Sequence, residues 1–206
     1  MQETHTRPKS KPVFDRIRAD ILGGHYHAGQ WLKQAELEAN YSATRSDVRA
    51  SLSSLHEQGL VEYVKNRGFR VYDRSPQELE EINELLAILE VAAAPSMVKN
   101  VDARALQDLE DAAEKFDKLV NGGSHVELRL ANYEYHRRLN DLCGSKLIAT
   151  HIRSLRERSI IGPFNRYTTF DGLRASSAEH FEIIALLRAR NAEKLAALLK
   201  AHVSHF

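Results

Sequence analysis

The sequence has one cysteine, one tryptophan and no apolar run long enough to span a membrane. With Cys143 alone, an intrachain disulfide and a cysteine-based zinc cluster are excluded, which suits a reducing compartment. The most apolar stretch, residues 85–98, is interrupted by Glu90 and Pro95 and falls short of the roughly 20 residues that a spanning helix needs. Residues 1–11 are polar and lack the apolar core of a secretory signal, so we expect a cytoplasmic location.

Composition and charge indicate a globular protein with one basic end. The 206 residues are 43% hydrophobic and 28% charged, and this length fits two small domains. The net charge of +1 is unevenly distributed. Residues 1–74 contain 12 Lys or Arg against 9 Asp or Glu, whereas residues 75–206 contain 17 against 19. The N-terminal part is therefore the better candidate for contact with nucleic acid.

The N-terminal part predicts three helices followed by a β-hairpin. Thr44 and Asp47 form a capping-box pattern, which indicates that the third helix begins there. Gly23 and Gly24 stop the first helix, and Gly59 stops the third. The expected elements are helices at 13–22, 34–40 and 44–58 and β-prone runs at 60–64 and 69–72.

Three helices closed by a hairpin with a basic tip form the layout of a winged helix-turn-helix, in which the third helix enters the major groove. Arg45 and Arg49 lie four residues apart on one face of that helix, and arginine can make paired hydrogen bonds to guanine. An isolated pair of arginines more often only solvates a helix, but the cap, the turn and the wing together favour DNA contact. The candidate DNA-binding residues are Thr44, Arg45, Ser46, Arg49, Lys65, Arg67 and Gly68.

After Arg74 the pattern changes to six helices without a further strand signal. Capping boxes predict helix starts after Ser75, Ser124 and Ser176, and Asp102 is expected to cap another helix. We expect Pro95 to kink or end the helix that contains it. The fold class is therefore mainly α, with a flexible arm at 1–11, a winged helix-turn-helix at 12–74 and an all-helical effector-binding domain at 75–206.

Four polar residues in the helical part form a candidate metal site. Asn132 and His136 lie i, i+4 on one helix face, and His180 and His202 occur on two later helices. Three neutral imidazoles and one amide oxygen are a plausible ligand set for Zn²⁺ or Ni²⁺, with positions left for water or a ligand. On residue types alone, three of ten histidines on amphipathic helices are more often ordinary core or surface residues.

The chain resembles the GntR family of bacterial regulators, in the branch with a FadR-type (FCD) effector domain and in its shorter, VanR-like six-helix form. Residues 44–52 are similar to the Ser-Arg-Thr-Pro-Val-Arg-Glu-Ala-Leu segment of that family, and residues 57–61 resemble the segment that leads to the wing. Asp47 and Ala50 depart from the pattern, and Ser42 stands where a glycine is expected. The resemblance implies a homodimeric repressor on double-stranded operator DNA, and it favours a divalent metal at Asn132, His136, His180 and His202.

The resemblance also implies a small-molecule effector. The usual residue at position 132 is Asp, so Asn132 removes one negative charge, and we expect the remaining charge of a divalent metal to attract a carboxylic acid. Leu86 stands where related proteins carry an arginine for the effector, and Arg153 or Arg156 could substitute. We expect a regulator rather than an enzyme. A metal-dependent hydrolase and a purely structural metal site remain the alternatives.

Overall fold

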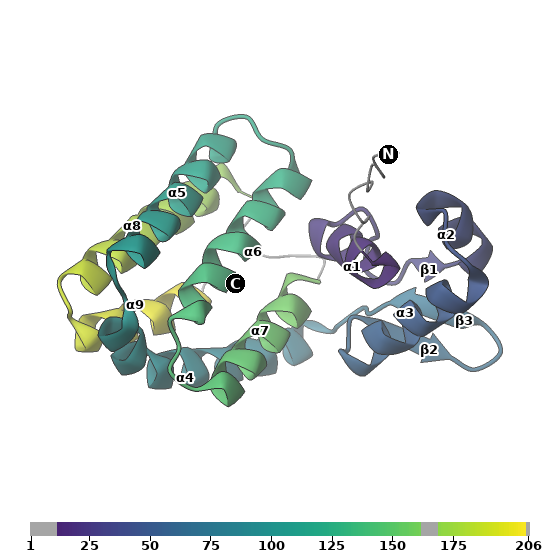
Figure 1. Cartoon of the computed structure of the whole chain (residues 1–206), viewed down its shortest axis with the longest axis horizontal. Helices are drawn as coiled ribbons and strands as arrows, with labels where there is room; N and C mark the ends of the chain where they lie inside the picture. The colour runs from purple at the N-terminus through teal and green to yellow at the C-terminus, as the bar shows by residue number, and fades with distance from the viewer. Residues whose placement is uncertain (1–11, 162–168, 205–206) are drawn as a thin grey trace, which may run out of the picture.

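The computed structural model describes residues 12–161 and 169–204. A small mixed α/β unit at the N-terminal end adjoins a bundle of longer helices (Figure 1). This architecture confirms the predicted fold class, which is mainly helical with a small sheet. The expected arm at 1–11 lies outside the described residues.

The N-terminal unit has the element order of a winged helix-turn-helix. Its strands form one antiparallel sheet in the order β1-β3-β2. The elements are α1 (Val13–Gly23), β1 (Trp31–Leu32), α2 (Gln34–Tyr41), α3 (Arg45–Glu57), β2 (Val61–Val64) and β3 (Gly68–Val71).

Local signals explain most of these boundaries. Gly24 ends α1 in the left-handed region at φ 86°, where a glycine costs no steric strain. Ser42 ends α2 at φ 50°, which is the backbone geometry expected of the glycine that it replaces. The Thr44 hydroxyl accepts a hydrogen bond from the Asp47 amide at 3.2 Å and fixes the start of α3 as predicted.

Strand β1 was not expected, because we interpreted its surroundings as a loop. Trp31 pairs with Arg70 and Leu32 pairs with Phe69, so β1 extends the hairpin to three strands. Two residues are too short to give an alternating pattern in the sequence, and the strand exists because β3 offers it a free edge. The sheet places the Trp31 side chain beside the wing.

The C-terminal part contains the six expected helices within the described residues. Ser75 and Ser124 begin α4 and α6 with complete capping boxes, and the Asp102 carboxylate caps α5. None of the described helices combines the length and apolarity that crossing a membrane requires. The helices are α4 (Pro76–Asn100), α5 (Ala103–Val120), α6 (His125–Asp141), α7 (Lys146–Ile160), α8 (Phe170–Arg188) and α9 (Ala192–Ser204).

Two expected boundaries of these helices were wrong. Helix α4 does not end at Pro95 but continues to Asn100, and the proline lies on its exposed side. Ser176 does not begin a helix. It lies buried inside α8, which begins after Thr169, whose hydroxyl accepts from the Gly172 amide at 3.2 Å. The capping-box pattern at Ser176 is coincidental because the apolar stripe of α8 starts earlier.

Candidate DNA-binding surface and candidate metal centre

The third helix presents its predicted reading face to solvent. Buried Val48, Leu52 and Leu55 fix one side of α3 in the core of the N-terminal unit. The opposite side of α3 faces solvent, and at the N-terminus of the helix free backbone N–H groups attract phosphate. All four predicted reader residues are exposed there, namely Thr44, Arg45, Ser46 and Arg49. Helix packing therefore leaves this face available.

The wing is a tight turn with basic side chains. Asn66 at φ 64° and Gly68 at φ 103° take the left-handed geometry that the turn requires. Lys65 and Arg67 are exposed at its tip. The guanidinium of Arg67 lies 4.5 Å from the centre of the Trp31 ring, so a cation–π contact holds it against the sheet. No local pattern in the sequence indicates this contact, because it depends on the pairing of β1 with β3.

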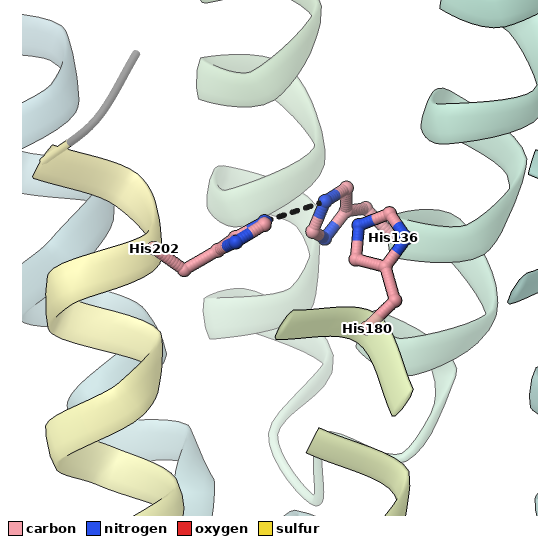
Figure 2. A group of neighbouring side chains, drawn as sticks. All are labelled: His136, His180 and His202. Atoms are coloured by element: carbon pink, nitrogen blue, oxygen red, sulfur yellow. Dashed lines mark hydrogen bonds between the residues drawn. The ribbon is translucent and has the colours of Figure 1, made fainter. Parts of the chain in front are cut away.

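The three predicted histidines converge in the core of the helical part. His136 from α6, His180 from α8 and His202 from α9 face one another (Figure 2). The Nε2 atoms of His136 and His202 are 3.1 Å apart, and one potential ligand atom from each imidazole lies within 4.8 Å of the others. All three side chains are buried. Residues separated by up to 66 positions thus form one site.

The environment keeps these imidazoles neutral. Burial lowers the pKa of His136 and of His180 well below the usual 6.5, and the nearby positive charge of Arg156 lowers both further. Burial also lowers the pKa of His202, although its hydrogen bond to Glu179 acts in the opposite direction. Neutral imidazole is the form that ligates metals.

Glu179 determines how His202 presents its ring. The Nδ1 atom of His202 lies 2.6 Å from a Glu179 carboxylate oxygen, and an ionised carboxylate can only accept. Nδ1 therefore carries the proton and Nε2 keeps a lone pair that faces His136. A carboxylate behind a histidine is a common arrangement around metal ions, because it orients the ring and makes it a stronger ligand.

Buried polar atoms without partners fit a bound cation. Four buried atoms have no hydrogen-bond partner among the described residues, namely Asn132 Oδ1, His136 Nδ1 and both ring nitrogens of His180. Buried polar atoms are otherwise nearly always paired. An ion bound through His136 Nε2 would pair two of these four atoms, namely Asn132 Oδ1 and one nitrogen of His180. Metal–nitrogen bonds of about 2.0–2.1 Å place neighbouring ligand atoms about 3.0–3.4 Å apart, which matches the 3.1 Å between His136 and His202.

The two predicted effector arginines lie beside this site. Arg153 and Arg156 on α7 surround, together with His136 and Asn140 of α6, a gap of about 10 Å³, which is the space of about one water molecule. Arg156 is mostly buried and binds Glu90 of α4 through two hydrogen bonds of 2.7 and 2.8 Å. Arg153 is exposed and lies 3.6 Å from Asp141.

Leu86, at the position where an effector arginine was considered, is buried in the apolar core. Four polar side chains near the histidines were not among the predicted site residues, namely Glu90, Asn140, Ser176 and Glu179. The Asn140 amide oxygen and the Ser176 hydroxyl are buried without a partner in the described part of the chain. Their spacing was a usable signal, since Asn140 is four residues after His136 and Ser176 is four before His180.

A winged helix-turn-helix joined to an all-helical domain defines a class of transcriptional regulators, and comparison with known families agrees. Residues 9–71 match the model of bacterial regulatory proteins of the gntR family, and residues 81–205 match the FCD domain. The chain therefore belongs to the GntR family and carries an FCD domain. It is a DNA-binding transcriptional regulator of this type.

Relatives and solved structures cover nearly the whole chain. The Nta operon transcriptional regulator of Aminobacter aminovorans is 26% identical over 88% of this chain and 85% of its own length. The HTH-type transcriptional repressor GlaR of Escherichia coli is 23% identical, with 91% and 89% covered. The structure of E. coli McbR/YncC superimposes with a TM-score of 0.84 at 20% identity, covering 93% of this chain and 92% of the other.

Proposed function

We propose that this protein is a ligand-responsive repressor whose affinity for operator DNA depends on a divalent metal and a small carboxylic acid in the helical domain. One observation carries this proposal: three buried, neutral histidines, two of which have ring nitrogens without a partner among the described residues, lie in the same chain as an exposed DNA-reading helix. The relative GlaR, which is 23% identical, is named a repressor, and this supports repression rather than activation.

In this proposal, α3 reads the operator and the wing binds the phosphate backbone. Arg45 and Arg49 reach base edges in the major groove, where each paired contact to guanine is worth about 1–3 kcal/mol of discrimination. Thr44 and Ser46 lie at the helix N-terminus and bind phosphate. Lys65 and Arg67 hold the flanking backbone, and Gly68 gives the wing its turn. Since phosphate contacts displace counterions, affinity should fall steeply with salt.

In the helical domain, His136, His180 and His202 would hold Zn²⁺ or Ni²⁺, with the Asn132 amide oxygen as a fourth ligand. The bound ion would supply positive charge and open coordination positions for a carboxylate. Because all four ligands are neutral, they would leave that charge uncompensated, which favours an anionic effector. An effector carboxylate at the ion would lie close to Arg153 and Arg156, and because the gap beside His136 is only about 10 Å³, side chains there would have to move to admit it.

A homodimer is the assembly that we propose. Helix α4 exposes an apolar stripe at Leu85, Ile88, Ala92 and Pro95, with the 3-4-3 spacing of a coiled-coil seam. Leu85 and Ile88 are 47% and 58% exposed, which is high for large apolar side chains that lie side by side. A second copy of the chain would cover this stripe and pair two reading helices on two half-sites.

Operator binding tests the proposal against its alternatives. Binding to the DNA upstream of its own gene would be measured with chelator-treated protein, with Zn²⁺ or Ni²⁺ added, and with metal plus a panel of carboxylic acids. A metal-dependent response to one acid supports sensing. A metal that binds but changes neither affinity nor the response to acids would indicate a purely structural role. Turnover of an ester or amide by metal-loaded protein would favour the hydrolase.

Dimerisation is tested separately by sedimentation. Ile88→Glu should convert a dimer to a monomer, because it buries a charge in the proposed seam. Leu147→Glu, at an exposed apolar position on α7, is the matched control and should remain dimeric. Wild-type protein that sediments as a monomer at micromolar concentration would contradict the proposed assembly.

A further inference from the structure

A hydrogen-bonded cluster joins the two halves of the molecule. Arg18 of α1 donates through Nε to Glu157 of α7 at 3.1 Å, and its Nη2 group donates to the Tyr133 hydroxyl of α6 at 2.9 Å and also to Glu157. The Tyr133 hydroxyl donates to Glu157 at 2.8 Å. Three elements from two domains therefore meet at one carboxylate.

The cluster lies in a low-dielectric environment. The Glu157 side chain is 5% exposed and that of Arg18 is 23% exposed. Burial alone would lower the pKa of Arg18, but the hydrogen bond and the charge of Glu157 outweigh burial and leave the pKa raised. Burial, with the Glu157 charge, raises the pKa of Tyr133 to about 12, so its hydroxyl remains a donor. Losing any partner would leave a buried charge partly unpaired.

The helices that supply this cluster also supply the candidate metal centre. On α6, Tyr133 follows Asn132 directly and precedes His136 by three residues. On α7, Glu157 follows Arg156, whose positive charge acts on all three histidines. A small rotation or shift of either helix at the histidines must therefore displace Tyr133 or Glu157. A helix transmits such a shift because its backbone is rigid over one turn.

The remaining contacts between the two domains also hold the N-terminal unit against the helical domain. Helix α1 packs on α6, and Ile160 and Ile161 at the end of α7 belong to the apolar core of the N-terminal unit (Figure 1). Arg129 of α6 donates to the Ile160 carbonyl. Arg74 is buried at the junction and donates to the carbonyls of Gly59 and Arg158. The cluster therefore adds to a junction that already contains apolar packing and hydrogen bonds from two further arginines to backbone carbonyls.

We propose that the Arg18–Tyr133–Glu157 cluster couples the histidine site to the DNA-binding unit. It holds α1 against α6 and α7 in one orientation, and a change at the histidines alters that orientation through Tyr133 and Glu157. This inference rests on the proposed function, because it names the route by which occupancy of the site reaches the reading helix.

Hydrogen exchange of backbone amides tests the contact and the coupling without DNA or effector. The variants are Tyr133→Phe, which removes only the hydroxyl, and Glu157→Gln, which removes the charge. The matched control is Arg138→Gln, because Arg138 also extends from α6 but bonds Glu134 and the Asp108 carbonyl within the helical domain. Exchange is followed in α1 and α6 for chelator-treated protein and after addition of Zn²⁺ or Ni²⁺.

In chelator-treated protein, Tyr133→Phe and Glu157→Gln should speed exchange in α1 about tenfold relative to wild type, and Arg138→Gln should not. Unchanged exchange of α1 in both variants would overturn the inference, regardless of how added metal changes the exchange rates. Added metal should slow exchange in α6 of all four proteins, but in α1 only of wild type and Arg138→Gln. Equal slowing of α1 in Tyr133→Phe would overturn the coupling. If metal slows no helix of the wild type, the proposed metal site fails, whereas the variants still decide whether the cluster docks α1.

Discussion

Chelator-treated protein should lose stability in mild acid because of its buried histidines. The folded state holds His136, His180 and His202 with lowered pKa values, mainly because burial penalises the charged form. In the unfolded chain the same imidazoles take up protons at a pKa of about 6.5. The unfolded state therefore binds more protons below pH 6.5. The contribution of these groups to stability is complete above that pH and falls as the pH decreases.

The size of the loss follows from proton linkage. One pH unit below 6.5, each imidazole that stays neutral in the folded state costs about 1.4 kcal/mol relative to neutral pH. His136 and His180 should contribute this amount each, and His202 less, because Glu179 favours its protonated form. The three together should cost about 3–4 kcal/mol at pH 5.5, which is a large part of the stability of a typical domain.

Urea unfolding between pH 5 and pH 8, followed by the fluorescence of the single tryptophan and by circular dichroism, measures this dependence. His180→Gln should reduce the loss between pH 7.5 and pH 5.5 by about 1.4 kcal/mol. His151→Gln is the control, because His151 is exposed on α7 and should change nothing. An acid dependence that is the same in His180→Gln and wild type would refute the reasoning.

Four further substitutions test other parts of the molecule. Arg49→Lys keeps the charge but loses the paired geometry, so operator affinity should fall about 5- to 100-fold while the slope of affinity against salt stays unchanged in fluorescence anisotropy. Trp31→Leu should weaken DNA binding about 2- to 5-fold in the same assay by releasing Arg67. Asn132→Asp should tighten metal binding and weaken the carboxylate response, both measured by calorimetry. Leu52→Ala in the core behind α3 should cost about 2–5 kcal/mol in urea unfolding.

Local signals in the sequence predicted the elements whose boundaries are determined locally. The capping boxes at Ser75 and Ser124 are complete in the structure, because a cap depends only on residues three apart. The same pattern at Ser176 predicted a helix start that was wrong, because a capping box contains no information about the residues that extend α8 toward its N-terminus. Strand β1 and the stacking of Arg67 on Trp31 depend on pairing across about 40 residues, which no local pattern records.

The sequence predicted which histidines lie close together, but it did not predict the residues around them. The i, i+4 pair Asn132 and His136 lies on one face of α6 as its spacing indicated, and the resemblance to the family selected His180 and His202 from ten histidines. The role of Glu179 required the structure, because α9 brings His202 against it from 23 residues away. For the same reason, the sequence could not show that Glu90 binds Arg156 or that Tyr133 meets Arg18.

Metal content per chain tests the central claim most directly. Wild-type protein and His136→Ala would be equilibrated with Zn²⁺ or Ni²⁺, freed of unbound ion by gel filtration and analysed by inductively coupled plasma mass spectrometry. We predict one metal ion per wild-type chain and almost none in the variant, with both proteins folded by circular dichroism. Wild-type protein without metal, or equal metal in His136→Ala, would contradict the assignment of the three buried histidines as a metal centre.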